Sequence, residues 1–305
     1  MYSYEGLLNL LNKKSLKKSD LTNKAGISSR TIAKISKGEK IADAVIKRLC
    51  AFFGCVPQEI CTEVCDNAIL QALREEKRAK LSGRLYHETQ IRLTYNSNRI
   101  EGSKLSEEQT RLIFETKTIG AENGLPVDDI IETANHFRAF DFIIDCAEAP
   151  LTEDIIKNIH KILKTGTNDS YLPWFNVGEY KNRANVVGGA ETAAPERVAD
   201  EMQKLLSQYN AKKGITVEDI IGFHYRFESI HPFQDGNGRV GRLICFKECL
   251  RFNIVPFIIE DAKKAFYYRG LKEWKNERGY LIDTCLDGQD NYKRILNYFN
   301  IPYSI

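Results

Sequence analysis

The stretch "SIHPFQDGNGRVGRL", residues 229 to 243, constrains the fold more than any other part of the sequence. It joins a helical pattern, "VEDIIGFHYRFES", to a second one, "RVGRLICFKECL", whose Val240, Leu243 and Ile244 share a core face. Between them, the residues from Asp235 to Gly238 predict a tight turn, because glycine adopts backbone conformations closed to other residues. The turn would present backbone N–H groups at a helix N-terminus, where anions bind readily.

The side chains around this turn indicate phosphorus chemistry. Arg239 and Arg242, at i and i+3 of the second helix, add fixed positive charge suited to a polyphosphate. Since phosphate would repel Asp235, this carboxylate is better explained as a ligand of Mg²⁺ that bridges it to phosphate oxygens. His231 stands four residues earlier, at the mouth of the turn, and suits a general base. The loop therefore predicts transfer of a phosphorus-containing group.

A calcium loop, a Walker loop and a purely structural turn each fit this stretch less well. An EF-hand calcium loop needs glycine at its sixth position, where Val240 stands, and glutamate at its twelfth, where Phe246 stands. A Walker loop needs G-x-x-x-x-G-K-[ST], which the sequence lacks. A glycine turn with a buried histidine, present only for structural reasons, explains neither the paired arginines nor Asp235.

With Arg242, "HPFQDGNGR" resembles the Fic family motif H-x-F-x-[D/E]-G-N-G-R-x-x-R at every specified position. The resemblance extends from about Tyr86 to near the C-terminus. It implies an all-α fold with one β-hairpin, the flap. It also implies transfer of AMP from ATP, with Mg²⁺, to a Ser, Thr or Tyr hydroxyl of a protein.

The resemblance assigns a role to each residue of the motif. His231 would deprotonate the attacking hydroxyl, Phe233 would anchor the loop in the core, and Asp235 would hold Mg²⁺. The phosphates would be held by Gly236, Asn237, Gly238, Arg239 and Arg242. The hairpin at Val186, Val187 and Gly188 would bind the target segment as an added strand. Tyr267 and Tyr268 would lie near the adenine, although both also fit a core position.

The resemblance gives the segment "SNRIEG" a second interpretation. Taken alone, it is a helix that ends at Gly102. It also fits the Fic inhibitory pattern [S/T]-x-x-x-E-[G/N] through Ser97 and Glu101, in a helix near residues 90–102. Glu101 would then pair with Arg242 and fill the space that the γ-phosphate needs, and relief would require a two-state shift of the helix. In some relatives this glutamate is thought to position water for removal of AMP.

The N-terminal segment differs from the rest in charge and pattern. Residues 1–64 carry 11 Lys and Arg against 6 Asp and Glu, a net charge of +5, whereas the remaining residues sum to −2. "SDLTNKAGISSRTIAKISKGEKI" predicts helix, glycine-containing turn and helix, with Ser28 or Ser29 as an N-cap. It resembles the phage-repressor/Cro helix-turn-helix, in which the second helix enters the major groove. The residues that would contact DNA are Ser29, Arg30, Lys34 and Lys37. A solvated lysine face or a protein partner remains the alternative.

These patterns predict a helix-turn-helix domain at residues 1–65, a linker helix at 66–85 and a Fic domain at 86–305. Cys50, Cys55, Cys61 and Cys65 lie close together but form no C-x-x-C pair, which argues against zinc. No apolar run reaches the 18 residues of a membrane span, and the start lacks a secretory signal, so a cytoplasmic protein without membrane contact is expected. A homodimer is left open.

Three functions remain open at this point. The first is an autoinhibited adenylyltransferase. The second is a transcription regulator whose Fic domain senses a nucleotide, and the third is an enzyme that mainly removes AMP. A phosphotransferase is disfavoured, because Fic relatives of that kind usually carry lysine where this chain has Gly238.

Overall fold

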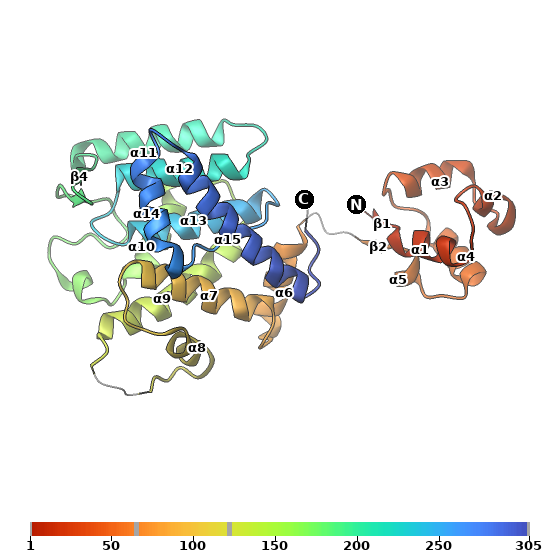
Figure 1. The fold of residues 1–305 in the computed structure, drawn as a ribbon, viewed down its shortest axis with the longest axis horizontal. Coiled ribbons are helices and arrows are strands. Elements are labelled where there is room, and N and C mark those ends of the chain that lie inside the picture. Colours follow the sequence, from red (N-terminus) through yellow and green to blue (C-terminus); the bar gives the residue numbers. More distant parts are fainter. Residues whose placement is uncertain (1, 64–66, 121–123, 304–305) are drawn as a thin grey trace. The chain divides into compact units, whose positions relative to one another are not determined.

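The computed structural model describes residues 2–63, 67–120 and 124–303, and within them the fold is helical apart from two strand pairs of two residues per strand. The all-α prediction is therefore confirmed. The chain divides into two units, residues 1–68 and 69–305 (Figure 1). Cys65 and the predicted domain boundary beside it lie outside the described residues. No helix within the described ranges has the length and apolar character that a membrane crossing demands.

The first unit is a small bundle around its own core. Its elements are β1 (Tyr2–Ser3), α1 (Glu5–Lys13), α2 (Asp20–Ala25), α3 (Ser29–Ser36), α4 (Asp43–Phe53), α5 (Pro57–Ile60) and β2 (Thr62–Glu63). Strands β1 and β2 pair antiparallel. The buried residues at helical spacing, among them Leu7, Leu11, Leu21, Ile35 and Leu49, form one hydrophobic cluster.

The turn between α2 and α3 follows from local sequence chemistry. Gly26 ends α2 in the left-handed region, with φ of 65°, a conformation that costs glycine no Cβ clash. Ser28 rather than Ser29 caps α3, because its side chain accepts the backbone N–H of Thr31. Ile27 and Ile35 are buried, which fixes α3 against the bundle.

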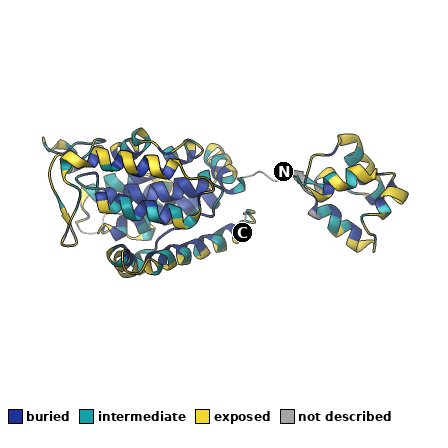
Figure 2. Ribbon diagram, turned by 90° about the horizontal axis from the view of Figure 1, so that it is seen from above, coloured by how far each residue is buried: buried dark blue, intermediate teal, exposed yellow. Residues whose placement is uncertain are grey.

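The second unit is a larger helical assembly. Its helices are α6 (Ala68–Ala79), α7 (Leu85–Ile100), α8 (Glu107–Thr116), α9 (Val127–Asp145), α10 (Glu153–Lys164), η1 (Asn168–Tyr171), α11 (Pro195–Asn210), α12 (Val217–Ile230), α13 (Asn237–Arg251), η2 (Asp261–Lys263), α14 (Lys264–Glu273) and α15 (Gly279–Tyr298). Helix α13 lies in the middle of this unit and contacts α7, α9, α10 and α12. Every residue from Asn237 to Leu250 is buried, and Figure 2 shows the dark interior that results. The beginning of α13 is therefore held from several sides.

Helix α6 is packed onto the second unit instead of linking the units with a solvated face. Its Ile69, Leu70 and Leu73 are buried in the large core. Arg74 donates to the carbonyl oxygen of Ile144, and Lys77 forms an ion pair with Asp145 at 2.7 Å. The sequence pattern does not reveal this packing, because a helix with one narrow apolar stripe has the same charged composition whether it packs or not.

The predicted hairpin corresponds to a very short strand pair. β3 (Val186–Val187) pairs antiparallel with β4 (Ala190–Glu191). Gly188 and Gly189 connect them with φ of 56° and 80°, as a two-residue hairpin turn requires. Strand pairing in this part of the chain is limited to these residues, so the structure does not show an extended flap.

Candidate active site

The loop from His231 to Gly236 is fixed by its own side chains. Helix α12 ends at Ile230, and His231 follows in the left-handed region with φ of 52°. Phe233 is fully buried and stacks on His160 with ring centroids 4.0 Å apart. The Asn237 side chain accepts the N–H of Phe233 at 2.8 Å and donates to its carbonyl oxygen at 2.9 Å. Asn237 therefore locks the loop with its side chain, which leaves only its backbone for the predicted phosphate cradle.

His231 is held as a neutral imidazole. Burial, and then the nearby Lys181, lower the pKa of His231 to about 4. Nδ1 has no hydrogen-bond partner among the described residues and lies 4.0 Å from Oε2 of Glu228. Burial, together with repulsion from Glu101, raises the pKa of Glu228 to about 8. A neutral imidazole at neutral pH is the form that can accept a proton.

Asp235 lies in a network of four buried or half-buried charges. Its Oδ2 accepts from Nζ of Lys164 at 2.7 Å and from Nη2 of Arg239 at 3.1 Å. Glu132 on α9 pairs with the same two cations. Burial opposes ionisation of Asp235, but Arg239 and Lys164 outweigh it and hold the pKa of the carboxyl well below its usual range. Asp235 is thus an anion at neutral pH, as a metal ligand must be.

Arg242 connects the loop with the end of α7. Its Nε donates to the Ser97 hydroxyl at 3.0 Å, and its Nη2 donates to the Ser97 carbonyl oxygen at 2.9 Å and to Oε1 of Glu101 at 2.6 Å. Glu101 is the C-cap of α7, so its carboxylate lies where α7 ends and close to the first turn of α13. A Cβ added at Gly238 would overlap Oε1 of Glu101. The carboxylate of Glu101 therefore occupies the first turn of α13, where an anion would bind.

The two tyrosines expected near the adenine have different surroundings. Tyr267 is 1% exposed, and its hydroxyl lies 2.8 Å from Nε2 of His224, so its ring belongs to the core beneath Arg242. Tyr267 is therefore packed as a core residue, and its contact with a nucleotide stays a prediction. Tyr268 is 42% exposed and donates to the carbonyl oxygen of Ile100 at the end of α7.

The hairpin is attached to the loop through its base. The backbone N–H of Lys181 donates to the carbonyl oxygen of Pro232, and the Asn185 side chain donates to that of Phe233. Nζ of Lys181 donates to Asn185 and Thr192, which join the two sides of the hairpin. Val186 is exposed, and so is Gly188. These contacts hold the base of the hairpin against the loop that follows His231.

Two side chains of the site, Lys164 and Glu132, were absent from the sequence prediction. Lys164 had a signal, because it continues the buried stripe of α10 that passes through Ile156 and His160 at spacings of four residues. A lysine at a core-facing position needs buried partners. Glu132 carried no such signal, since acidic residues are common along half-buried helices and only the fold brings it to Asp235.

The residues present fit a magnesium ion that arrives with phosphate. No three His, Cys, Asp or Glu side chains in the described ranges are arranged to hold a metal by themselves. Both ion pairs of Asp235 use Oδ2, and its side chain is 49% exposed. Since Mg²⁺ is usually bound through one or two carboxylates with waters and substrate phosphates, a single open carboxylate at an anion-binding turn suits it.

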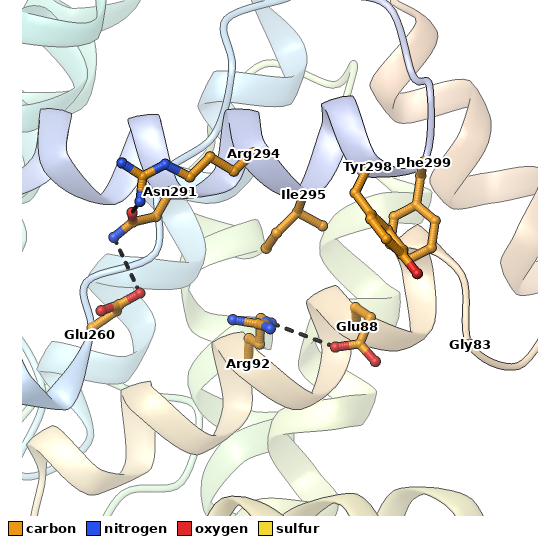
Figure 3. Close-up of a pocket in the computed structure, with 9 residues that line it drawn as sticks. All are labelled: Gly83, Glu88, Arg92, Glu260, Asn291, Arg294, Ile295, Tyr298 and Phe299. Atoms are coloured by element: carbon orange, nitrogen blue, oxygen red, sulfur yellow. Dashed lines mark hydrogen bonds and ion pairs between the residues drawn. The ribbon is translucent and has the colours of Figure 1, made fainter.

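A separate cavity of about 730 Å³ lies between α7 and α15. Figure 3 shows Glu88 and Arg92 of α7 facing Asn291, Arg294 and Tyr298 of α15. None of the predicted site residues lines it. The cavity is therefore distinct from the loop site.

On the first unit, α3 presents the predicted DNA-contacting residues. Ser29, Arg30 and Lys37 are exposed, and Lys34 is half-buried. Lys18 adds a further cation beside α3, because its Nζ lies 3.3 Å from the Ser36 hydroxyl. The helix therefore offers a basic surface, as contact with a polyanion needs.

Family models match both units of the chain. Residues 150–248 match the Fic/DOC family, and residues 6–66 match the Cro/C1-type HTH DNA-binding domain. The protein adenylyltransferase Fic of Drosophila melanogaster is 30% identical over 182 residues, 58% of this chain and 36% of that protein. That of Drosophila willistoni is 28% identical over 210 residues, 68% of this chain and 40% of that protein. The chain thus spans less than half the length of these relatives.

Solved structures share the fold. A Fic domain containing signaling protein from Bacteroides thetaiotaomicron superimposes with a TM-score of 0.57 at 27% identity, covering 75% of this chain and 90% of that one. Fic-1 from C. elegans superimposes with a TM-score of 0.60, covering 88% of this chain and 81% of that one. At 19% identity, the second match shows the fold alone.

Proposed function

The chain carries a Fic/DOC-family domain and a Cro/C1-type helix-turn-helix domain, and from this premise we propose that it transfers AMP from ATP to a Ser, Thr or Tyr hydroxyl of a protein. The observation that supports this most is the loop geometry: a neutral His231 stands beside the glycine turn that opens α13, with Asp235, Arg239 and Arg242 around it. The matched curated relatives are named protein adenylyltransferases.

In the proposed reaction, the target hydroxyl attacks the α-phosphorus of ATP. His231 takes the hydroxyl proton, the new oxygen–phosphorus bond forms, and the bond to the β-phosphate oxygen breaks so that pyrophosphate leaves. The backbone N–H groups at the start of α13, with Gly236 and Gly238, hold phosphate oxygens. Arg239 and Arg242 stabilise the leaving pyrophosphate. Val186 and its neighbours bind the target backbone as an added strand.

Asp235 would hold Mg²⁺ through its carboxylate. Bound there, the ion would neutralise charge on the phosphates and help to orient them. Phe233 and Asn237 keep Asp235 in place by fixing the loop on either side of it. Tyr267 and Tyr268 remain the candidates for contact with the adenine, and of the two Tyr268 lies at the surface beside the end of α7.

We also propose that the described arrangement is inhibited. Glu101 pairs with Arg242 and occupies the first turn of α13, so Arg242 is not available to a γ-phosphate while α7 stays in place. Ser97 holds the same guanidinium. We propose AMP removal as the alternative direction, in which the same carboxylate orients a water.

The test is incorporation of label from α-labelled ATP with Mg²⁺ into the protein itself or into lysate proteins. Four proteins are compared: wild type, Glu101→Gly, Glu101→Gln and Glu101→Gly with His231→Ala. We expect strong labelling by Glu101→Gly and none by the double variant. Glu101→Gln keeps the shape but not the charge, so it should label at an intermediate level.

Silence of every variant that still binds ATP would contradict transfer. Loss of label from a pre-modified protein on adding wild type would instead favour AMP removal. The nucleotide-sensing regulator predicts that His231→Ala keeps its full effect on transcription. The basic surface of α3 supports DNA binding as an additional property of the first unit.

A further inference from the structure

The ammonium group of Lys164 lies at the meeting point of three carboxylates. Lys164 ends α10 and is 2% exposed. Its Nζ is 2.7 Å from Oε1 of Glu132, 2.7 Å from Oδ2 of Asp235 and 3.3 Å from Oδ2 of Asp169. These carboxylates come from α9, from the turn before α13 and from η1. Three separate elements are thus joined through one buried cation.

This arrangement has the chemistry of a cation site. Carboxylate oxygens from several elements around one point are what hard divalent cations prefer. The oxygens lie farther from the common centre than metal–oxygen bonds of about 2.0–2.6 Å. They are spaced for an ammonium nitrogen, and a metal could replace it only if they moved inward.

The charge balance shows what Lys164 contributes. Glu132, Asp169 and Asp235 supply three negative charges, and Lys164 and Arg239 supply two positive ones. Without Lys164 the cluster would carry a net charge of −2, with Glu132 largely buried and Asp169 and Asp235 half-buried. Carboxylates so close together repel one another strongly unless a cation lies between them.

Lys164 also borders the proposed phosphate site. Its Cγ and Cδ lie 3.7 and 3.6 Å from the position that a Cβ on Gly236 would take. The side chain therefore passes beside the glycine turn and reaches Asp235 from the interior, while Asp235 itself is 49% exposed.

We propose that Lys164 is a resident cation that fills this three-carboxylate site and keeps divalent metal out of it when no nucleotide is bound. Lys164 is then a positioning residue: it holds Asp235 toward the turn, so that metal is taken up only together with phosphate oxygens. The role of Asp235 as a metal ligand rests on the proposed function, but occupancy of the site by Lys164 does not.

The test measures binding of Mn²⁺ without nucleotide, by the loss of the free-ion EPR signal and by calorimetry. The full chain is compared as wild type, Lys164→Met and Lys157→Met. Lys157 is the matched control, because it lies on the same helix between two carboxylates, Glu153 and Glu179, but at the surface. We expect Lys164→Met to bind Mn²⁺ at least about tenfold more tightly than wild type, and Lys157→Met to match wild type.

Thermal unfolding gives a second readout. Lys164→Met should unfold at a lower temperature than wild type and should recover on adding Mn²⁺, whereas wild type should not respond to the ion. If Lys164→Met is too unstable to purify, Lys164→Met with Glu132→Gln lowers the carboxylate charge by one. That double variant should bind Mn²⁺ more tightly than wild type but less tightly than Lys164→Met where both can be measured.

Equal Mn²⁺ affinity in wild type and Lys164→Met, or in wild type and the double variant, overturns the proposal. Failure of AMP transfer is a different result. If Lys164→Met gains Mn²⁺ binding while every Glu101 variant binds ATP but transfers nothing, the resident cation is supported and the transferase is contradicted.

Discussion

Arg242 takes part in two competing states of the site. In the described arrangement, its guanidinium is satisfied by the hydroxyl and carbonyl of Ser97 and by Glu101. In the proposed reaction, the same group binds a phosphate. Because Arg242 is 4% exposed, it cannot leave the Ser97 and Glu101 contacts for water, and must exchange them for another anion. The strength of the inhibition therefore depends on each partner of one arginine.

Ser97→Ala should weaken this inhibition without removing it. The substitution takes away the acceptor of Nε and leaves the carbonyl of Ser97 and the carboxylate of Glu101. A loss of about 1 kcal/mol from the closed state would raise AMP incorporation about fivefold. We expect labelling above wild type and below Glu101→Gly.

The control for this experiment is Ser103→Ala. Ser103 is also buried near the end of α7, but its hydroxyl accepts from the backbone of Leu105 and does not contact Arg242. Labelling by Ser97→Ala no higher than by Ser103→Ala would show that Glu101 alone sets the inhibition.

At the scale of elements, the site is built where helices begin and end. His231 follows α12, Glu101 caps α7, and the phosphate turn opens α13. The sequence predicted these three ends, because glycine and a specific motif mark them. It could not predict how α9 and α10 bring Glu132 and Lys164 to Asp235, since helix spacing gives the face of a helix but not its neighbour.

The same limit applies to two local patterns that fit more than one environment. Tyr267 and Tyr268 are adjacent in the sequence, yet α14 turns one into the core and the other toward the surface. Helix α6 was expected to link the units, but its apolar stripe packs on the larger one. In both cases the local pattern was compatible with two environments, and tertiary contacts decided between them.

Helix α3 carries a prediction about DNA binding. Arg30→Ala removes an exposed cation from the helix expected in the major groove. With a random-sequence 30-base-pair duplex, we expect weaker binding and a salt dependence reduced by about one ion, since each phosphate contact releases about 0.9 counterion. Fluorescence anisotropy at several salt concentrations measures both.

Lys47→Ala serves as the control for charge alone, because Lys47 is exposed on α4 and not on α3. An equal loss in the two variants would indicate attraction to DNA by overall charge and would argue against α3 as the contacting helix.

At the scale of the second unit, buried histidines make stability depend on pH. Burial lowers the pKa of His136, His160 and His224 to about 3, and that of His231 to about 4, from an ordinary value of 6.5. Between about pH 4 and 6.5, each of the four is protonated in the unfolded chain but largely neutral in the folded chain. The free energy of unfolding therefore falls as the pH falls from about 6.5 to 4.

Glu228 acts in the opposite direction. Burial raises the pKa of Glu228 to about 8 in the folded chain. Between pH 4.5 and 8, Glu228 is therefore protonated in the folded chain and releases that proton on unfolding. Between pH 4.5 and 6.5, four histidine protons are taken up on unfolding and one glutamate proton is released. The net uptake of three protons corresponds to a slope of at most about 4 kcal/mol per pH unit.

Tryptophan fluorescence can follow this transition in the second unit alone, because both tryptophans of the chain, Trp174 and Trp274, lie in it. Urea unfolding at a series of pH values gives the slope. His136→Asn keeps an acceptor for the Thr94 hydroxyl, which lies 2.9 Å from Nδ1, and removes one titrating group. We expect it to reduce the slope by about 1.4 kcal/mol per pH unit. A slope that is flat in wild type would contradict the lowered pKa of the four histidines, and a slope equal in wild type and His136→Asn would contradict the lowered pKa of His136.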